Sequence, residues 1–421
     1  MKIEVKATSI VKPAEPTPRH NLWVSNLDLV HVRIHMTTLH FYKRIDNGGS
    51  DFFDSDLERD KNGRVEIVCN EDGVLFVEAE SDCVIDELGE SIQTSPLPQL
   101  VPPGDDGDLN LDISSFPLLL VQLTRFKCGG VCLGIGLHHI PVDGISAMQI
   151  INSWADVARG LPITITPFID RTILRARDPP SPTFNHPEYD PPPSLITAKQ
   201  IDQFQSNSTF VVSVTRDHLQ RLKARAIDGG NKAKYYTTYE IFVAHTWRCV
   251  SKARGLAANQ ATRVHVAVNG RSRLFPPLPE GYVGNVIFHM NIPALACELE
   301  SEHLSDTVQR IHGAIKKMDD GYMKSALDYL ELHPNLDALV PKKGNEIYRN
   351  PNLSIVSWNR LPMDSDFGWG PAMYVRPASI YTEGKGYLLA SPRNDERGFL
   401  SLVLCLETRH VQDFKKLFYD V

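Results

Sequence analysis

Three features of the sequence predict an α/β protein with two domains. The chain has 421 residues, more than one ordinary hydrophobic core holds. Segments with the two-residue period of strands and segments with the 3.6-residue period of helices occur in both halves, without the regular alternation of a TIM barrel. A proline-rich stretch separates the halves. We therefore expect an N-terminal domain over residues 1–178, a crossover over 179–198 and a C-terminal domain over 199–421.

Three segments of the first half have a clear period. Residues 1–6 alternate charged and apolar side chains, as a strand does. Residues 131–137 alternate branched with small side chains, which predicts a strand with one narrow face. After Gly144, residues 146–154 place apolar side chains at helical spacing, and Gly160 predicts the end of that helix.

The crossover and the second half are predicted in the same way. Prolines within 178–182 and 190–193 exclude a helix or a central strand, because proline lacks the amide hydrogen and clashes with the preceding turn. Thr237-Thr238-Tyr239-Glu240 resembles a capping box that opens a helix through Trp247. Further strands are expected at 263–269 and 400–406.

Composition excludes several classes of protein. With 42% hydrophobic and 23% charged residues the chain is typical of globular proteins. A formal net charge of −7 argues against a general nucleic-acid binder. No apolar stretch is long enough for a bilayer span or a signal peptide, so we expect no membrane contact and a cytoplasmic location. Seven cysteines, an odd number and mostly in apolar runs, predict reduced thiols.

The most informative segment is His138-His139-Ile140-Pro141-Val142-Asp143-Gly144. It lies where a strand gives way to a helix, and its proline and glycine force an irregular connection. Such a junction can hold an imidazole at the edge of a cavity, as a general base requires. Asp143 could fix the histidine tautomer directly or brace the loop by pairing with a distant arginine. The alternative is an ordinary hydrogen-bonded histidine at a domain edge.

Two other readings of this segment are weaker. A metal site formed by His138, His139 and Asp143 is disfavoured, because neighbouring strand residues point to opposite faces. A serine hydrolase would need Gly-x-Ser-x-Gly, and residues 144–148 lack the final glycine. No phosphate loop or dinucleotide fingerprint is present. Chemistry without a covalent enzyme intermediate is the simpler interpretation.

A second segment, Asp366-Phe367-Gly368-Trp369-Gly370, predicts a tight turn. The indole N–H of Trp369 could donate to an oxyanion, although a buried structural turn is the more frequent role of such a segment.

Together, His139-x-x-x-Asp143-Gly144 and Asp366-Phe367-Gly368-Trp369-Gly370 resemble the two signatures of the plant BAHD acyltransferases, in matching order and separation. The similarity runs nearly end to end and is greatest with the hydroxycinnamoyltransferase branch, which includes rosmarinate synthases and shikimate or quinate transferases. Other stretches that carry it are 21–23, 126–130, 151–154, 167–172, 281–285 and 325–330.

The resemblance implies two chloramphenicol-acetyltransferase-like domains with a channel between them, in which coenzyme A and an acceptor meet at His139. His139 would take the acceptor proton, and Asp143 would pair with Arg271 or Arg273. Trp369 would shape the channel or oxyanion region.

The resemblance places Thr237, Arg271 and Ser272 near coenzyme A. It implies no metal or bound cofactor, an acyl-CoA co-substrate, a small hydroxylated aromatic acceptor and a monomer.

The acceptor pocket departs from the pattern of this family. Shikimate-accepting members have an arginine directly after Gly-Trp-Gly, which grips the acceptor carboxylate. Here that position is Pro371, and the nearest arginine is Arg376. The pocket strand has Thr38 and His40 in place of serine and tyrosine. We therefore expect hydroxyphenyllactate, as in the rosmarinate-forming branch, to be favoured over shikimate.

A second departure is an absence. Between Asp56 and Leu57 the family has a helix and a buried strand that this chain lacks. A mis-spliced gene model or a deletion would leave the same gap. Hypotheses that remain open are an O-acyltransferase, an N-acyltransferase with an amine acceptor, and a degenerate protein that binds ligands without turnover.

Overall fold

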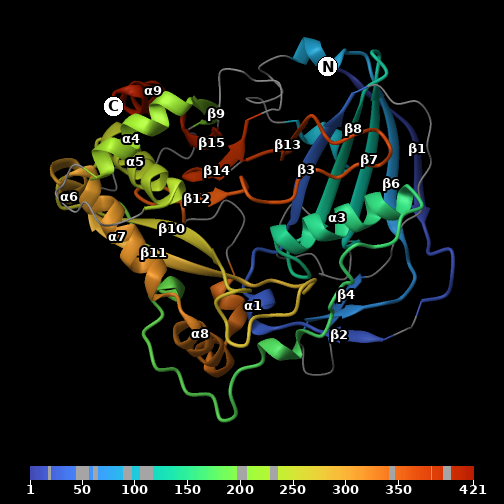
Figure 1. Ribbon diagram of the computed structural model, residues 1–421, viewed down its shortest axis with the longest axis horizontal. Coiled ribbons are helices and arrows are strands. Elements are labelled where there is room, and N and C mark those ends of the chain that lie inside the picture. Colours follow the sequence, from blue (N-terminus) through green and yellow to red (C-terminus); the bar gives the residue numbers. More distant parts are fainter. Residues whose placement is uncertain are drawn as a thin grey trace.

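The computed structural model describes residues 1–17, 20–43, 56–59, 65–88, 97–104, 117–196, 206–227, 236–340, 347–380, 382–391 and 400–421. Two six-stranded sheets lie side by side, each with helices against it (Figure 1). In the described part no helix is both long and apolar enough to cross a bilayer. The α/β fold with two sheet-rich units agrees with the prediction.

The first sheet has the strand order β1-β6-β7-β8-β3-β13. Its strands are β1 (Ile3–Val11), β3 (His35–Tyr42), β6 (Val74–Ser81), β7 (Leu119–Phe126), β8 (Val131–His138) and β13 (Tyr374–Pro377). Helix α3 (Gly144–Ala158) lies across one face (Figure 1) and buries Met148, Ile151 and Trp154 against it. A small core that includes Leu39, Phe41 and Leu100 covers the other face.

A close backbone approach explains the small residues of β8. A Cβ at Gly134 would lie only 1.8 Å from the carbonyl oxygen of Leu100, so no other residue fits there. The narrow face predicted for this strand is therefore real, and it lets the 98–101 segment pack directly on the sheet. This tight packing fixes the strand that leads into the candidate catalytic loop.

The second sheet has the order β11-β10-β12-β14-β15-β9 and contains the larger hydrophobic core. Its strands are β9 (Asn207–Val214), β10 (Ala261–Asn269), β11 (Ile287–Leu295), β12 (Leu353–Ser357), β14 (Lys385–Ala390) and β15 (Leu400–Glu407). The helices of the second half are α4 (Arg216–Ile227), α5 (Thr238–Ala253), α6 (Ala296–Ser301), α7 (Leu304–Lys317), α8 (Asp320–Leu332) and α9 (Val411–Tyr419). Helix α5 alone contributes Phe242 and Trp247, both fully buried.

A third, small sheet joins β2 (Asn21–Trp23), β5 (Val65–Val68) and β4 (Asp56–Arg59) in that spatial order. Short helix α1 (Asn26–Leu29) follows β2 and contacts α8. The junction Asp56–Leu57 lies in β4, whereas residues 44–55 and 60–64 on either side lie outside the described part.

The expected elements all occur, with longer bounds. The capping box at Thr237 opens α5, which runs beyond Trp247 to Ala253. Gly160 lies just beyond α3 with φ of +71°. The crossover has no strand and only a short 3-10 turn, Pro187–Tyr189, over its described residues 179–196.

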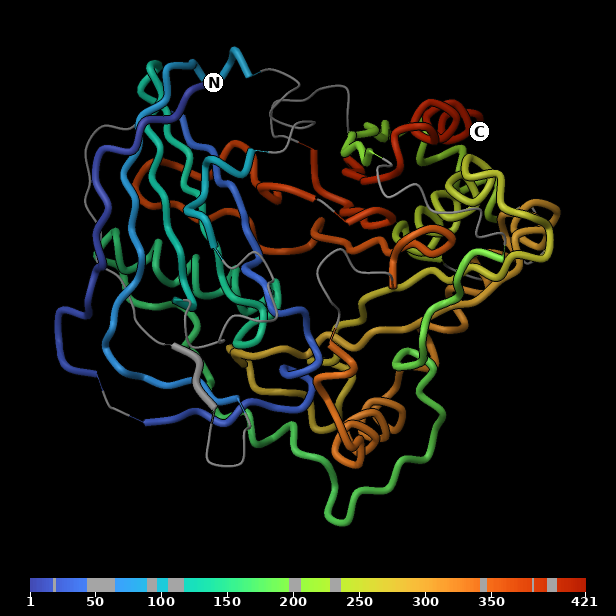
Figure 2. Tube along the Cα trace, turned by 180° about the vertical axis from the view of Figure 1, so that it is seen from behind, coloured from blue at the N-terminus to red at the C-terminus, as the bar shows by residue number. Residues whose placement is uncertain are grey.

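One strand from the second half of the sequence lies in the first sheet. Strand β13 belongs to the 199–421 half of the sequence but pairs antiparallel with β3 of the first sheet, Arg376 opposite Leu39. Figure 2 shows this orange segment reaching from the C-terminal half to the N-terminal sheet. The apolar turn before β13 buries Phe367 and Ala372 in the core beneath α3, which holds the segment in the first domain.

Candidate active site

The motif at 138–144 forms the connection between β8 and α3. The side chain of His138 lies away from the cavity, with its ring edge-on to His35 at a centroid distance of 5.4 Å. His139 lines the cavity. The two histidines therefore point in different directions, as the alternation of a strand requires, and His138, His139 and Asp143 do not converge on a metal.

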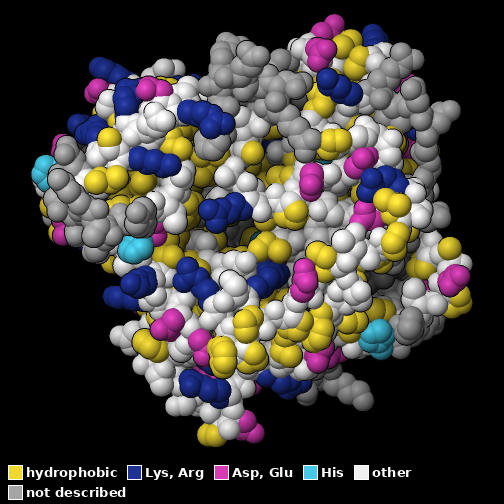
Figure 3. Space-filling model, viewed as in Figure 1, with side chains coloured by type: hydrophobic (Ala, Val, Ile, Leu, Met, Phe, Trp, Pro, Cys, Tyr) yellow, Lys and Arg dark blue, Asp and Glu magenta, His cyan; other side chains and the backbone are white. Residues whose placement is uncertain are grey.

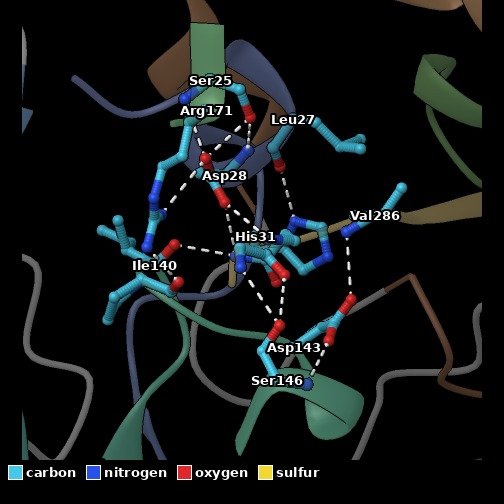
Figure 4. A network of polar contacts seen from close by, with 12 residues as sticks. Ser25, Leu27, Asp28, His31, Ile140, Asp143, Ser146, Arg171 and Val286 are labelled. Carbon is cyan, nitrogen blue, oxygen red and sulfur yellow. Dashed lines mark hydrogen bonds and ion pairs between the residues drawn. The ribbon is translucent and has the colours of Figure 1, made fainter. Parts of the chain in front are cut away.

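Backbone carbonyls of this loop are held from outside it. Asn285 donates from its side-chain amide to the carbonyls of His139 at 2.9 Å and Ile140 at 2.8 Å. Arg171 donates to the carbonyl of Pro141 at 2.7 Å. Asp28, on α1, contacts both donors: its carboxylate lies 3.5 Å from the guanidinium of Arg171 and accepts a 2.9 Å bond from the side-chain amide of Asn285. Figure 4 shows Asp28 and Arg171 beside Ile140 of the loop.

Asp143 braces the loop and does not hydrogen-bond to His139. It caps α3 by accepting from the amides of Ile145 and Ser146. Its two carboxylate oxygens accept from Arg271 at 2.8 and 3.0 Å. The amide of Val286 adds a 3.0 Å bond.

This buried ion pair sets the charge of Asp143. Burial alone would raise the pKa of the carboxyl, but the charge and hydrogen bonds of Arg271, with backbone amides, hold that pKa below its usual value. Of the two candidate arginines, Arg271 makes the pair, whereas Arg273 donates to the carbonyls of Ile315 and Met318. The motif is thus tied to the second domain by a charge-assisted bond.

The imidazole of His139 is neutral at physiological pH. Burial, with a smaller contribution from the nearby His31 at a ring-centroid distance of 4.8 Å, lowers its pKa to about 3. Its Nδ1 is buried without a hydrogen-bond partner among the described residues, whereas the ring as a whole is half-buried. The neutral imidazole at the cavity wall has one unprotonated nitrogen, and this is the form that a general base needs.

The cavity beside His139 has a volume of about 2000 Å³ and is lined by residues of both domains. It is large enough for two substrates of drug size. Four cationic side chains line it, namely Arg273, Lys316, Arg360 and Lys385. Figure 3 shows Lys and Arg side chains gathered around the hollow in the middle of this face. The cavity is therefore suited to anionic ligands.

Three residues predicted to approach coenzyme A lie in different places. Ser272 and Thr237 line the cavity. The hydroxyl of Thr237 is committed to capping α5, accepting from the amide of Glu240 and donating to its carboxylate. Arg271 does not line the cavity, because its guanidinium is held by Asp143. Arg271 therefore braces the motif, and its contact with coenzyme A stays a prediction.

Trp369 does not line the cavity either. Its ring packs edge-on against Tyr42 at 5.2 Å and beside Phe367 at 5.5 Å. The indole N–H is buried without a partner among the described residues, and Gly368 and Gly370 turn the chain with φ of +91° and +79°. This segment therefore forms a tight structural turn, and its indole N–H does not reach the cavity as an oxyanion donor would.

The predicted acceptor-binding residues also lie away from the cavity. Thr38 and His40 are buried and bonded to each other at 3.1 Å, and burial lowers the pKa of His40 to about 4. Arg376 is completely buried and donates to the carbonyl of Pro377. Pro371 is exposed. The first residues of β3, His35, Met36 and Thr37, line the cavity instead.

Sequence reasoning missed several functional residues. His31 and His289 line the cavity next to His139, and Lys385 lines it from β14. Asn285 lies within residues 281–285, a stretch that carried the family resemblance, and this signal could have marked it as a site residue. No local pattern marks the other three. His289 and Lys385 follow ordinary strand periods, His31 lies just after the short helix α1, and tertiary packing brings all three to the cavity.

The family model described as the Transferase family matches residues 1–57 and 51–421. The two matched ranges overlap at residues 51–57, the stretch that contains the Asp56–Leu57 junction. The segment expected to be missing there stays a prediction.

Curated relatives resemble the chain along their full length. It is 44% identical to a shikimate O-hydroxycinnamoyltransferase of Nicotiana tabacum. It is 43% identical to a hydroxycinnamoyl-CoA:5-hydroxyanthranilate N-hydroxycinnamoyltransferase of Avena sativa and 40% identical to a rosmarinate synthase of Plectranthus scutellarioides. Each alignment covers 100% of both chains.

Solved structures show the same fold at low identity. Vinorine synthase matches with a TM-score of 0.72 and 20% identity over 100% of both chains. TRI101 of F. sporotrichioides, complexed with coenzyme A and T-2, matches with a TM-score of 0.76 and 17% identity, covering 94% of this chain and 97% of its own.

Proposed function

Because the chain belongs to the Transferase family of BAHD acyltransferases, and is therefore an acyl-CoA-dependent acyltransferase, we propose that it moves a hydroxycinnamoyl group from coenzyme A to a hydroxyl acceptor. The observation that carries this proposal is a neutral His139 at the wall of a cavity shared by two domains. A base in that place can meet two substrates that arrive from different sides.

The chemistry follows from the form of the imidazole. His139 takes the proton of the acceptor hydroxyl while the oxygen attacks the thioester carbonyl. The tetrahedral intermediate then collapses, the carbon–sulfur bond breaks, and the proton passes from His139 to the departing thiolate. The products are an ester and free coenzyme A. Since acyl-CoA is a co-substrate, this route uses no bound cofactor or metal.

The donor binds at the basic part of the cavity wall. Ser272 and Arg273 line it there, together with Lys316 at the end of α7, and phosphate groups favour such cations. The acyl thioester would then extend inward to His139. The protein can work as a monomer, because both walls of the cavity come from one chain. We place it in the cytosol.

We favour 4-hydroxyphenyllactate as the acceptor. Pro371 stands where an arginine clamp is expected in shikimate-accepting members, and the buried Arg376 does not line the cavity in its place. Both observations weaken shikimate as the acceptor. They do not bear on the transfer step itself.

The test is release of free thiol from 4-coumaroyl-CoA, with 4-hydroxyphenyllactate, shikimate or 5-hydroxyanthranilate as acceptor and mass spectrometry of each product. We expect an ester with hydroxyphenyllactate and no product from His139→Ala. Faster turnover with shikimate overturns the choice of acceptor, and an amide from hydroxyanthranilate favours N-acylation. No thiol release by a folded protein with any acceptor supports a binding-only protein that lost activity with the missing segment.

A further inference from the structure

Lys385, the first residue of β14, places its ammonium group at the cavity wall. Nζ lies 4.4 Å from the ring centroid of Tyr348 and 5.7 Å from that of Tyr387. It also donates to the hydroxyl oxygen of Ser354 at 3.2 Å. Two aromatic faces and one hydroxyl therefore hold the cation in a fixed position.

No carboxylate of the described residues forms an ion pair with Lys385, although the cavity wall has three. Asp143 is paired with Arg271. Glu188 accepts from His186 and Tyr322, and Glu240 is bonded to Thr237 and His312. A cation removed from bulk water without a counter-charge is unfavourable, so such a group in a cavity is a functional candidate.

Lys385 is the charged group among several neutral, buried imidazoles of the cavity wall. The cavity-lining imidazoles of His31, His139, His265 and His289 all have their pKa lowered mainly by burial, and the charge of Lys385 lowers each further. The Nε2 of His265 is itself buried without a partner among the described residues. The ammonium group of Lys385, which has no ion pair with a described carboxylate, and the unpartnered Nε2 of His265 thus lie on the wall of the same cavity as His139.

We propose that Lys385 binds the carboxylate of the acceptor and so takes the part of the arginine that Pro371 replaces. This inference rests on the proposed acyl transfer. In an α-hydroxy acid the carboxylate is attached to the carbon that bears the reacting hydroxyl. A cation near His139 therefore holds both groups of such an acceptor in place, with the hydroxyl directed to the base.

The phosphates of coenzyme A are a second possible anion, but their position argues against them. The long pantetheine arm separates them from the sulfur, and the sulfur must reach His139. Anionic groups of the donor then lie near Arg273 and Lys316, and the anion closest to His139 comes from the acceptor.

Burial gives this contact a pH dependence. It lowers the pKa of Lys385 to about 8. An acceptor carboxylate binds the charged form, so the KM for a carboxylated acceptor should rise as the pH increases through 8 in the wild type. The same KM should lose this rise in Lys385→Met, which has no ammonium group to titrate.

The experiment compares wild type, Lys385→Met and Lys385→Arg with 4-coumaroyl-CoA and two matched acceptors, 4-hydroxyphenyllactate and its methyl ester. Shikimate and methyl shikimate form a second pair. We expect Lys385→Met to raise the KM for the acid about 10- to 100-fold, with the KM for 4-coumaroyl-CoA and the turnover of the ester unchanged. Lys385→Arg should recover part of the loss. Lys415→Met is the matched control, because Lys415 lies over the ring of Phe210 at 5.4 Å and does not line the cavity.

Three results would overturn the proposal. Equal losses with the acid and the ester would assign Lys385 a structural role. A raised KM for 4-coumaroyl-CoA alone would assign it to the donor. Unchanged kinetics in Lys385→Met would remove it from recognition altogether. Failure of the proposed function looks different, because the wild type itself would then release no thiol with any acceptor.

Discussion

Two charged side chains, Asp143 and Lys385, lie at the wall of the same cavity in opposite circumstances. Asp143 is fully buried, and donors from Arg271, Val286 and the start of α3 satisfy its carboxylate. Lys385 has two aromatic rings and one hydroxyl, and no ion pair with a described carboxylate. A charge matched by the protein stabilises the site, whereas an unmatched charge beside a cavity is available to a ligand.

The largest effect should come from His139, which lines the same cavity as these two charges. His139→Gln removes the base and should lower kcat about 10²- to 10⁴-fold. Thiol release under saturating substrates measures it. The neighbouring His138→Gln is the matched control, since His138 does not line the cavity and should keep its kcat per folded molecule. Equal losses in both variants would contradict the assignment of His139.

Breaking the matched charge should reduce stability. Asp143→Asn leaves the partly buried Arg271, whose side chain is 15% exposed, without its counter-charge, and we expect a loss of up to about 3 kcal/mol in the free energy of unfolding. Urea denaturation measures it. Arg273→Gln should change this free energy by less than about 0.5 kcal/mol, because that side chain bonds only to carbonyls near the surface. A similar loss of stability in Asp143→Asn and Arg273→Gln would show that the Asp143–Arg271 ion pair does not stabilise the fold more than an ordinary surface contact.

Acid should weaken the fold through its buried histidines. Burial lowers the pKa of His139 and His265 to about 3 and of His245 to about 4. The unfolded chain binds protons near pH 6.5, so stability is complete above that value and falls as the pH decreases toward the folded pKa. Each such histidine costs up to about 1.4 kcal/mol per pH unit. Urea midpoints at pH 7.5 and 5.5 test this, and equal midpoints would contradict it.

The smallest effect is expected at Trp369. The indole N–H has no partner among the described residues, and its ring packs against Tyr42. Trp369→Phe should therefore change kcat by less than about threefold and stability by about 1–2 kcal/mol. An oxyanion donor would cost about 10²- to 10³-fold in kcat. A loss of that size would return Trp369 to the reacting centre.

The sequence predicted the local parts of this site better than the parts that tertiary structure assembles. The strand, the connection at Pro141 and the helix after Gly144 have local signals, so the place of His139 followed from them. The motif left open whether Asp143 orients the histidine or pairs with a distant arginine, and only the family resemblance named Arg271, 128 residues away, as a candidate.

The acceptor pocket could not be inferred in the same way. Thr38 and His40 lie on β3, and their distance from the cavity depends on which face of that strand packs under α3. Lys385 looks like any polar residue at the start of a strand. Only the tertiary structure places Lys385 at the cavity wall, because β14 lies between β12 and β15 in the second sheet.

The most direct test of this account is a crystal structure with coenzyme A and 4-hydroxyphenyllactate bound. We expect the acceptor hydroxyl about 3 Å from Nε2 of His139 and the carboxylate in an ion pair with Lys385, while Arg271 stays on Asp143. An acceptor that binds out of reach of His139, or whose carboxylate draws Arg271 away and leaves Lys385 without a ligand, would contradict it.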